Sequence, residues 1–243
     1  MARALFISDL HLASERPATS ERLFRFLEEE AARADALYVL GDLFEYWIGD
    51  DELGASGDPL ARRVARRLRE LTDAGVEVRL MHGNRDFLLG REFCAASGAQ
   101  LLDDPALLRV GGEPTLLMHG DTLCTDDQDY QAWRRTARSG SWQREFLGQP
   151  LAVRRETVLQ MRETSKAVIG AKPAQIMDVA PEAVRAAFRR HGVRRLIHGH
   201  THRAARHELE VDGARRERWV LPDWYGPGGY LVVDEVGARL VGF

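Results

Sequence analysis

Short apolar runs recur along the chain, and five of them end in a loop made of Asp, Asn, His and Gly. The loops are Ser8-Asp9-Leu10-His11, Gly41-Asp42, Gly83-Asn84-Arg85-Asp86, His119-Gly120-Asp121 and His198-Gly199-His200-Thr201-His202. Apolar runs separated by amphipathic stretches predict strands that alternate with helices. In α/β folds, ligands gather outside the carboxyl ends of the strands. The chain is therefore expected to bring distant polar side chains together at one place.

The remaining segments fit the same α/β interpretation. Expected strands are Ala4–Ile7, Leu37–Leu40, Val76–Met81, Thr115–Met118 and Arg195–Ile197, and expected helices are Glu21–Ala34, Pro59–Ala74 and Pro181–His191. Ser20 is a possible N-cap of the first helix. From about Ala204 to Val241 the chain alternates in short runs, which predicts antiparallel strands.

Length and composition favour one domain spanning residues 1–243 in a reducing compartment. The 243 residues can bury a sizeable core, and the net charge of −3 gives no indication of nucleic-acid binding. Cys94 and Cys124 are expected to be free thiols. No segment reaches the roughly 18 apolar residues that span a bilayer. We expect a cytoplasmic protein, or one that lies on a membrane without crossing it.

Residues 127–172 interrupt the alternation of strands and helices. They contain no convincing strand, and aromatic and aliphatic residues such as Tyr130, Trp133 and Trp142 stand among many arginines. The segment is predicted to form helices inserted between two strands, as a cap. The alternative is a second helical layer with a solvated basic face.

The side chains of the five loops have the chemistry of a metal site. They offer carboxylates, imidazoles and an amide oxygen but no thiolate, which suits manganese, iron or zinc better than calcium. Asp9 and His11 are two residues apart, so an extended backbone would point both the same way. His200 and His202 have the same spacing. Glycines beside the loop residues would let the backbone turn sharply and approach an ion.

The motifs DLH, GD, GN, HGD and GHTH, in this order, resemble the calcineurin-like metallophosphoesterases. The resemblance implies a four-layer αββα sandwich, in which two sheets pack face to face with helices outside, here with a helical cap insertion. It implies that Asp9, His11, Asp42 and His202 hold one metal. Asp42, Asn84, His119 and His200 would hold the other, with Asp42 bridging. His198 matches no ligand position.

Longer motifs narrow the resemblance. GDLFEYWIGDD, HGNRDFLLG, MHGDTLCTDD, IMDV and IHGHTHR are similar to the UDP-2,3-diacylglucosamine diphosphatases of Gram-negative bacteria. That family cleaves a lipid-linked UDP-sugar to UMP and lipid X in lipid A biosynthesis. The resemblance implies two manganese ions, action at the inner face of the inner membrane, and no obligate protein partner.

The resemblance also implies a set of substrate contacts and catalytic residues. Substrate contacts would come from Asn84, Arg85, Asp127, Ser165, Lys172 and His200, and the catalytic residues would be Asp42, Asn84 and Arg85. Ile169 stands where relatives often carry Asn, which puts one substrate hydrogen bond in doubt. Each contact has a simpler alternative: Asp127 could cap a helix that begins near Gln128, and Ser165 and Lys172 could be ordinary surface residues.

Three functions remain open at this point. The first is the lipid-linked nucleotide-sugar diphosphatase, whose cap would enclose acyl chains and place a basic face, including Arg134, Arg135 and Arg138, on anionic lipid. The second is another dinuclear metallophosphoesterase, such as a phosphoprotein phosphatase or a dinucleotide polyphosphate hydrolase. The third is a non-catalytic scaffold, which would be expected to have lost some ligands.

Overall fold

Two mixed sheets form the centre of the protein. The computed structural model describes residues 3–171 and 177–243, with the backbone alone for residues 164–171. The six-stranded sheet has the order β11-β10-β1-β2-β3-β4, with bounds β1 (Ala4–Ile7), β2 (Ala36–Leu40), β3 (Glu77–Met81), β4 (Gln100–Leu102), β10 (Gly229–Asp234) and β11 (Gly237–Gly242). The five-stranded sheet has the order β5-β6-β7-β9-β8, with bounds β5 (Ala106–Val110), β6 (Glu113–Leu117), β7 (Arg195–His198), β8 (Ala205–Val211) and β9 (Ala214–Val220).

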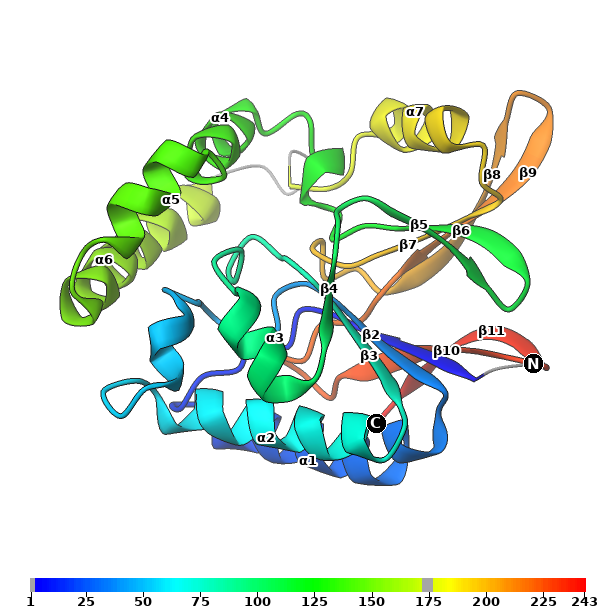
Figure 1. The fold of residues 1–243 in the computed structure, drawn as a ribbon. Coiled ribbons are helices and arrows are strands. Elements are labelled where there is room, and N and C mark those ends of the chain that lie inside the picture. Colours follow the sequence, from blue (N-terminus) through cyan, green and yellow to red (C-terminus); the bar gives the residue numbers. More distant parts are fainter. Residues whose placement is uncertain (1–2, 172–176) are drawn as a thin grey trace.

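Helices cover the outer faces of both sheets and complete the four layers of the expected sandwich (Figure 1). The six-stranded sheet is covered by α1 (Pro17–Glu29), α2 (Pro59–Asp73) and α3 (Arg91–Ser97), and the five-stranded sheet by α7 (Pro181–His191). Three further helices, α4 (Gln128–Ala137), α5 (Gly140–Leu147) and α6 (Leu151–Ala171), lie together at one side of the sandwich.

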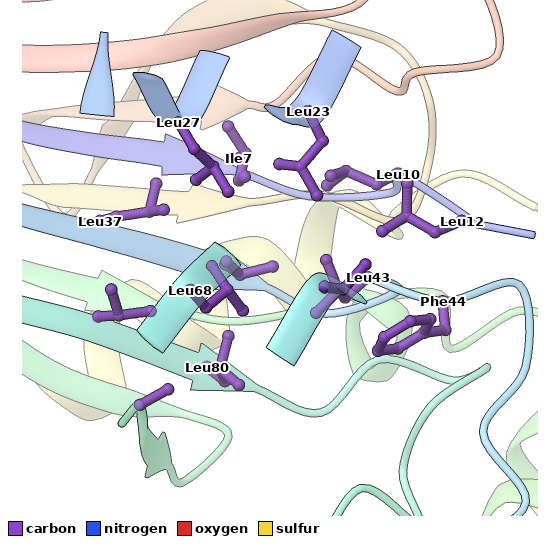
Figure 2. Packing of buried hydrophobic residues seen from close by; sticks show 14 of the residues in the cluster. Ile7, Leu10, Leu12, Leu23, Leu27, Leu37, Leu43, Phe44, Leu68 and Leu80 are labelled. Carbon is purple, nitrogen blue, oxygen red and sulfur yellow. The ribbon is translucent and has the colours of Figure 1, made fainter. Parts of the chain in front are cut away.

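Alternate residues of the central strands face different cores. Leu5 and Ile7 of β1 pack with α1 and α2, whereas Phe6 points into the space between the two sheets and stacks on Tyr38. Figure 2 shows the helix-side core, where Leu23 of α1 and Leu68 of α2 meet the strand residues. Both faces of these strands are buried, which is why their sequences are continuous apolar runs.

The strands that carry the polar loops are parallel within each sheet. β1 pairs with β2 and β2 with β3 in parallel, and so do β6 with β7 and β7 with β9. Their carboxyl ends therefore meet within each sheet, and hydrogen bonds from His119 to the Leu40 carbonyl and from the His200 amide to Asp9 bring the two edges together. The expected antiparallel tail is confirmed as two hairpins, β8–β9 and β10–β11, which join different sheets.

Two local expectations change. α1 begins at Pro17 rather than Glu21, because proline is preset for the first helical position, and Ser20 lies buried inside the helix instead of capping it. α3, β4 and β5 were not predicted from the sequence.

Both cysteines, Cys94 and Cys124, are free as expected. In the part of the chain that is described, no helix is long and apolar enough to cross a membrane.

Candidate metal centre

The loop after β1 is anchored by its alternate apolar residues. Leu10 and Leu12 pack into the helix-side core together with Leu43 and Phe44 of the loop after β2 (Figure 2). The polar residues between them are thereby turned away from that core. A local sequence of alternating apolar and polar residues thus fixes which side chains are available for chemistry.

The backbone of these loops is left-handed where extended geometry was expected. Positive φ occurs at five of the seven predicted ligands: Asp9 (55°), His11 (49°), Asp42 (53°), His200 (68°) and His202 (55°). The expectation that each pair two residues apart sits on an extended backbone is therefore wrong. Such conformations cost about 1–3 kcal/mol each and persist only where the surroundings impose them. Here the amides of Asp9 and His11 donate to the carbonyls of Gly41 and Asp42, at 3.1 and 2.9 Å.

A first group of donor atoms comes from Asp9, His11 and His202. Nε2 of His11 lies 3.3 Å from Nε2 of His202, and Oδ1 of Asp9 lies 3.5 Å from Nε2 of His202. Oδ2 of Asp42 is 3.8 Å from Nε2 of His11. Two donors that each sit ~2.1 Å from one ion, at right angles, are ~3.0 Å apart. The spacing therefore suits four ligands around one ion.

A second group comes from Asn84, His119, His200 and Asp42. Oδ1 of Asn84 lies 3.0 Å from both Nε2 of His119 and Nδ1 of His200. Oδ1 of Asp42 is 3.9 Å from Nε2 of His119. The two oxygens of Asp42 thus face the two groups, and the Asp9 carboxylate is also close to Asp42 and His119. The structure brings all seven predicted ligands together.

The donor atoms of this centre fit a cation. Oδ1 of Asp9 is buried with no hydrogen-bond partner, although Oδ2 accepts from Ser8 and from the amide of His200. Nδ1 of His119 lies 2.9 Å from the Leu40 carbonyl, so a proton there leaves Nε2 free to bind a metal. Burial, with the neighbouring Asp86 and Asp9 carboxylates, raises the pKa of Asp42 to about 7. Such crowding of carboxylates favours a bound positive charge.

Two glycines permit the close approach of the loops. A Cβ on Gly83 would lie 2.0 Å from Oδ1 of Asp42, and one on Gly199 would lie 2.3 Å from Oδ2 of Asp9. Any side chain at either position would displace a carboxylate of the centre. The expected role of the glycines beside these loops therefore has a steric basis.

Two buried carboxylates in the same loops support the centre, and sequence reasoning assigned them no role. Asp86 accepts from the amides of Gly83 and Leu43, both at 2.8 Å, and so ties the loops after β2 and β3 together. Asp121 accepts from the Tyr130 hydroxyl at 2.5 Å and from Nε of Arg134 at 2.7 Å. Their place inside the loop motifs was the available signal, but the partners follow from the fold, since Asp86 binds the loop after β2 and Asp121 binds α4.

The predicted substrate residues have different outcomes. Asp127 is the N-cap of α4, where its carboxylate accepts from the amide of Tyr130 at 3.1 Å, and its contact with the substrate stays a prediction. Ser165 and Ile169 lie on the backbone of α6, and their side chains are outside the described residues. Lys172 also lies outside them. Arg85 is adjacent to Asn84, and its amide donates to Oδ1 of Asp42 at 2.8 Å.

His198 is a core histidine. It is fully buried, with Nδ1 2.9 Å from the Gly199 carbonyl and Nε2 3.0 Å from the Arg218 guanidinium. Burial and the positive charge of Arg218 lower the pKa of His198 to about 3. The ring is therefore neutral and serves the packing behind the GHTH loop, consistent with its omission from the expected ligands.

The arginines of residues 127–172 do not form a solvated basic face. Of the seven in this segment, five bind the sandwich: Arg134 to Asp121, Arg138 to the Gly83 carbonyl, Arg154 to Asp51, Arg155 to Glu52 and Arg162 to Glu45. Arg134 and Arg138 were expected to meet lipid, and this is wrong because buried carboxylates and carbonyls of the sandwich need these donors. Arg135 and Arg144 are exposed.

Comparison with known proteins gives a consistent result. The calcineurin-like phosphoesterase family matches residues 2–204. A UDP-2,3-diacylglucosamine hydrolase of Pseudomonas paraeruginosa is 49% identical over 98% of this chain and 98% of its own. Proteins with the same name from Cellvibrio japonicus and Chromohalobacter salexigens are each 48% identical, over 97% of this chain and 97% and 95% of their own lengths.

Proposed function

The chain belongs to the calcineurin-like phosphoesterase family, and we propose from this premise that it hydrolyses the pyrophosphate bond of UDP-2,3-diacylglucosamine. The products are UMP and 2,3-diacylglucosamine 1-phosphate (lipid X). The observation that carries the proposal is the 49% identity to a hydrolase of that name over 98% of both chains. The seven candidate ligands of this chain argue against the scaffold alternative, since a scaffold would be expected to have lost some of them.

The chain's own donors define how two metal ions would be held. Asp9, His11, Asp42 and His202 would hold one ion, and Asp42, Asn84, His119 and His200 the other. When bound, the ions would supply Lewis acidity toward the phosphates and lower the pKa of a coordinated water. We propose manganese, with iron or zinc as alternatives, because the site offers nitrogen and oxygen donors without thiolate.

Arg85 is suited to bind phosphate but not to donate a proton. Its guanidinium is partly exposed beside the metal centre, and it can hold two phosphate oxygens through parallel hydrogen bonds. A guanidinium stays protonated in proteins, so it cannot serve as a general acid. An alkoxide leaving group would need such an acid, whereas a sugar phosphate leaves as a stable anion. This favours a phosphoanhydride substrate, with attack at the UMP phosphorus.

The acylated half of the substrate is assigned to the helical cap, residues 127–172. Asp127, Ser165 and Lys172 are proposed to contact the substrate, and His200 to contact the substrate as well as a metal. Large apolar side chains on the cap are exposed: Trp133, Leu147, Val153, Leu159 and Met161. Each acyl methylene buried against such side chains contributes about 0.8 kcal/mol. The same surface is proposed to rest on the inner face of the inner membrane.

Hydrolysis of the purified lipid substrate in oxygen-18 water tests the reaction and its direction. The label is expected in UMP, and label in lipid X would refute attack at the UMP phosphorus. A phosphoserine peptide and diadenosine tetraphosphate represent the alternative phosphoesterases. Turnover of either one without turnover of the lipid would refute the proposed substrate.

Replacing Arg85 tests the leaving-group chemistry. Arg85→Ala is expected to lose about 10²–10³ in kcat with both metals retained, because it removes a charged donor aimed at the phosphates. Metal content measured on the same samples separates this effect from damage to the centre. Activity of the wild type on an alkyl phosphate monoester, comparable to that on the lipid, would contradict the leaving-group argument.

A further inference from the structure

Glu45, three residues after the ligand Asp42, is a buried carboxylate that receives three guanidinium groups. Its side chain is 5% exposed. Oε1 lies 2.8 Å from Arg162 and 3.9 Å from Arg85, and Oε2 accepts from Arg16 and from the Tyr225 hydroxyl at 3.1 Å. We call these five residues the Glu45 cluster. Its arginines come from three separate segments: the loop before α1, the loop after β3 and the cap helix α6.

The charges of the Glu45 cluster do not balance. Three guanidinium groups around one carboxylate leave a net charge of about +2, because arginine remains protonated. Both oxygens of Glu45 are engaged as acceptors, so it is not placed to bind a metal. Without the carboxylate, three like charges would repel one another in a partly buried space, and each long side chain would find another position.

The Glu45 cluster borders the first donor group of the metal centre. The Tyr225 ring stacks on the imidazole of His11 with centroids 4.8 Å apart, and the Arg16 guanidinium lies 4.7 Å from the centre of the Tyr225 ring. Arg16 also donates to the His11 carbonyl. Arg85 follows the ligand Asn84 directly. One carboxylate thus connects a cap arginine, Arg162, with the loop residues that surround the centre.

We propose that Glu45 is a positioning residue for the hydrolysis, one that holds Arg85 and Arg162 at a common point beside the metal centre. Arg162 brings the cap with it, so the same carboxylate sets the placement of the cap relative to the reacting phosphates. This rests on the proposed function, because a phosphate-bearing substrate is the ligand that the surplus positive charge would take.

Glu52 offers a matched control within the same chain. It is equally buried, and it accepts from Arg155 of the same cap helix, with both oxygens 3.0 Å from the guanidinium, and from the amide of Asp58. Like Glu45, it fastens α6 to the sandwich. Among the described residues, Glu52 bonds to Arg155 and Asp58, and neither belongs to the metal centre. Substitutions at the two positions therefore separate positioning from simple fastening.

The first test compares Glu45→Gln with Glu52→Gln in the manganese-loaded full chain. Turnover is measured on the lipid substrate and on the small diester bis(4-nitrophenyl) phosphate, together with metal content and Tm. Glu45→Gln is expected to lower kcat by about 10- to 100-fold on both substrates with metal content unchanged, since small misplacements of binding groups have effects of this size. The two variants are expected to lower Tm by similar amounts, but Glu52→Gln is expected to keep kcat within about twofold of the wild type. Equal kcat effects in the two variants, or metal loss that matches the activity loss in Glu45→Gln, would overturn the proposal.

A double-mutant cycle tests the link to the cap. If Glu45 acts through Arg162, the kcat losses of Glu45→Gln and Arg162→Gln on the lipid substrate will not multiply. The double variant will then have about the kcat of the less active single variant. Multiplying losses would overturn the proposal. Should Glu45→Gln fail to fold, Arg162→Lys replaces it in the test, because lysine keeps the charge but lacks the planar guanidinium. Wild-type kcat in Arg162→Lys would also overturn the proposal.

The two proposals can fail separately. Wild-type protein that hydrolyses the small diester but not the lipid would refute the proposed substrate alone. The comparison of Glu45→Gln with Glu52→Gln is then decided on the small diester, where Arg85 is still expected to act.

Discussion

The metal centre and the helical cap are held in place by different interactions. The loops of the centre are anchored by apolar cores, and the left-handed Asp9, His11 and Asp42 are fixed by backbone hydrogen bonds between the ends of β1 and β2. The cap is joined to the sandwich by arginine side chains that reach carboxylates and carbonyls, and by an apolar contact through Phe146. It also carries five of the ten exposed large apolar side chains of the described residues.

This difference matches what each region has to do. Metal ligands must stay within fractions of an ångström of one geometry, which requires close packing on every side. The proposed lipid-binding surface must leave apolar side chains uncovered, so fewer of them, chiefly Phe146 with Trp142, Leu151 and Val158, are left to hold the cap. Partly exposed ion pairs stabilise by only about 0–1 kcal/mol each. We therefore expect the cap to loosen before the metal centre does.

The largest expected effect concerns the metal centre. Asp42→Ala should disturb both donor groups, since its two oxygens face His11 and His119, and turnover should fall by several orders of magnitude. His11→Ala should chiefly affect the first group and leave one ion bound. Metal content and turnover are measured on both proteins. Full activity of Asp42→Ala with metal present would contradict the assignment of Asp42 as a bridging ligand.

The next effect concerns the cap. Phe146 is 4% exposed and stacks on Trp142 with ring centroids 4.8 Å apart, and it belongs to the helix-side core. Phe146→Ala should destabilise the cap by about 3 kcal/mol. Limited proteolysis within residues 128–171 should accelerate while metal content holds. Leu159→Ala, at an exposed cap position, is the control and should change little; loss of metal in Phe146→Ala would break the distinction between the two regions.

A smaller effect is expected where the two regions meet. The Asp104 side chain is 7% exposed, and the nearest cation is Arg134 of α4 at 3.9 Å. Burial and the nearby Asp121 carboxylate raise the pKa of Asp104 to about 6. A carboxyl whose pKa is raised by folding favours the folded state in its neutral form, so its contribution is lost as pH rises from about 4 to about 6.

Asp104→Asn should therefore stabilise the protein by about 2 kcal/mol above pH 6, with a difference that shrinks toward pH 4. Urea unfolding at several pH values measures it, and Asp103→Asn, at the exposed neighbour, is the control. A stability difference that does not depend on pH would contradict this origin.

The smallest effect concerns the membrane. Arg135 and Arg144 are the exposed arginines of the cap, and each should contribute about 1 kcal/mol to binding of anionic vesicles. Arg135→Glu with Arg144→Glu should weaken sedimentation with such vesicles, and added salt should reduce the wild-type signal. Arg25→Glu, on α1 away from the cap, should bind as the wild type does (Figure 1). Equal partitioning of all three proteins would remove the cap from the membrane proposal.

Prediction from sequence worked best where a local pattern decides the outcome. β1, β2 and β7 were found as apolar runs because both of their faces are buried, and β3 and β6 were found from the buried apolar residues toward their carboxyl ends. β4 and β5 were missed because one has three residues and the other alternates exposed and buried positions at the sheet edge. The candidate metal-binding loops followed from residue types at strand ends, which lie at one edge whenever the strands are parallel, and the resemblance to the phosphoesterases then selected seven candidate ligands from them.

By itself, the sequence determined the sandwich, the family and the candidate ligands, because each depends on patterns within a few residues of one another or on motifs. The tertiary structure alone decided which arginines meet solvent and which meet Asp121, Glu52 or Glu45. It also decided the left-handed backbone at the ligands. The physical reason is that a charged side chain takes its partner from whatever distant segment packs beside it, and a strained φ persists only when neighbouring loops hold it there.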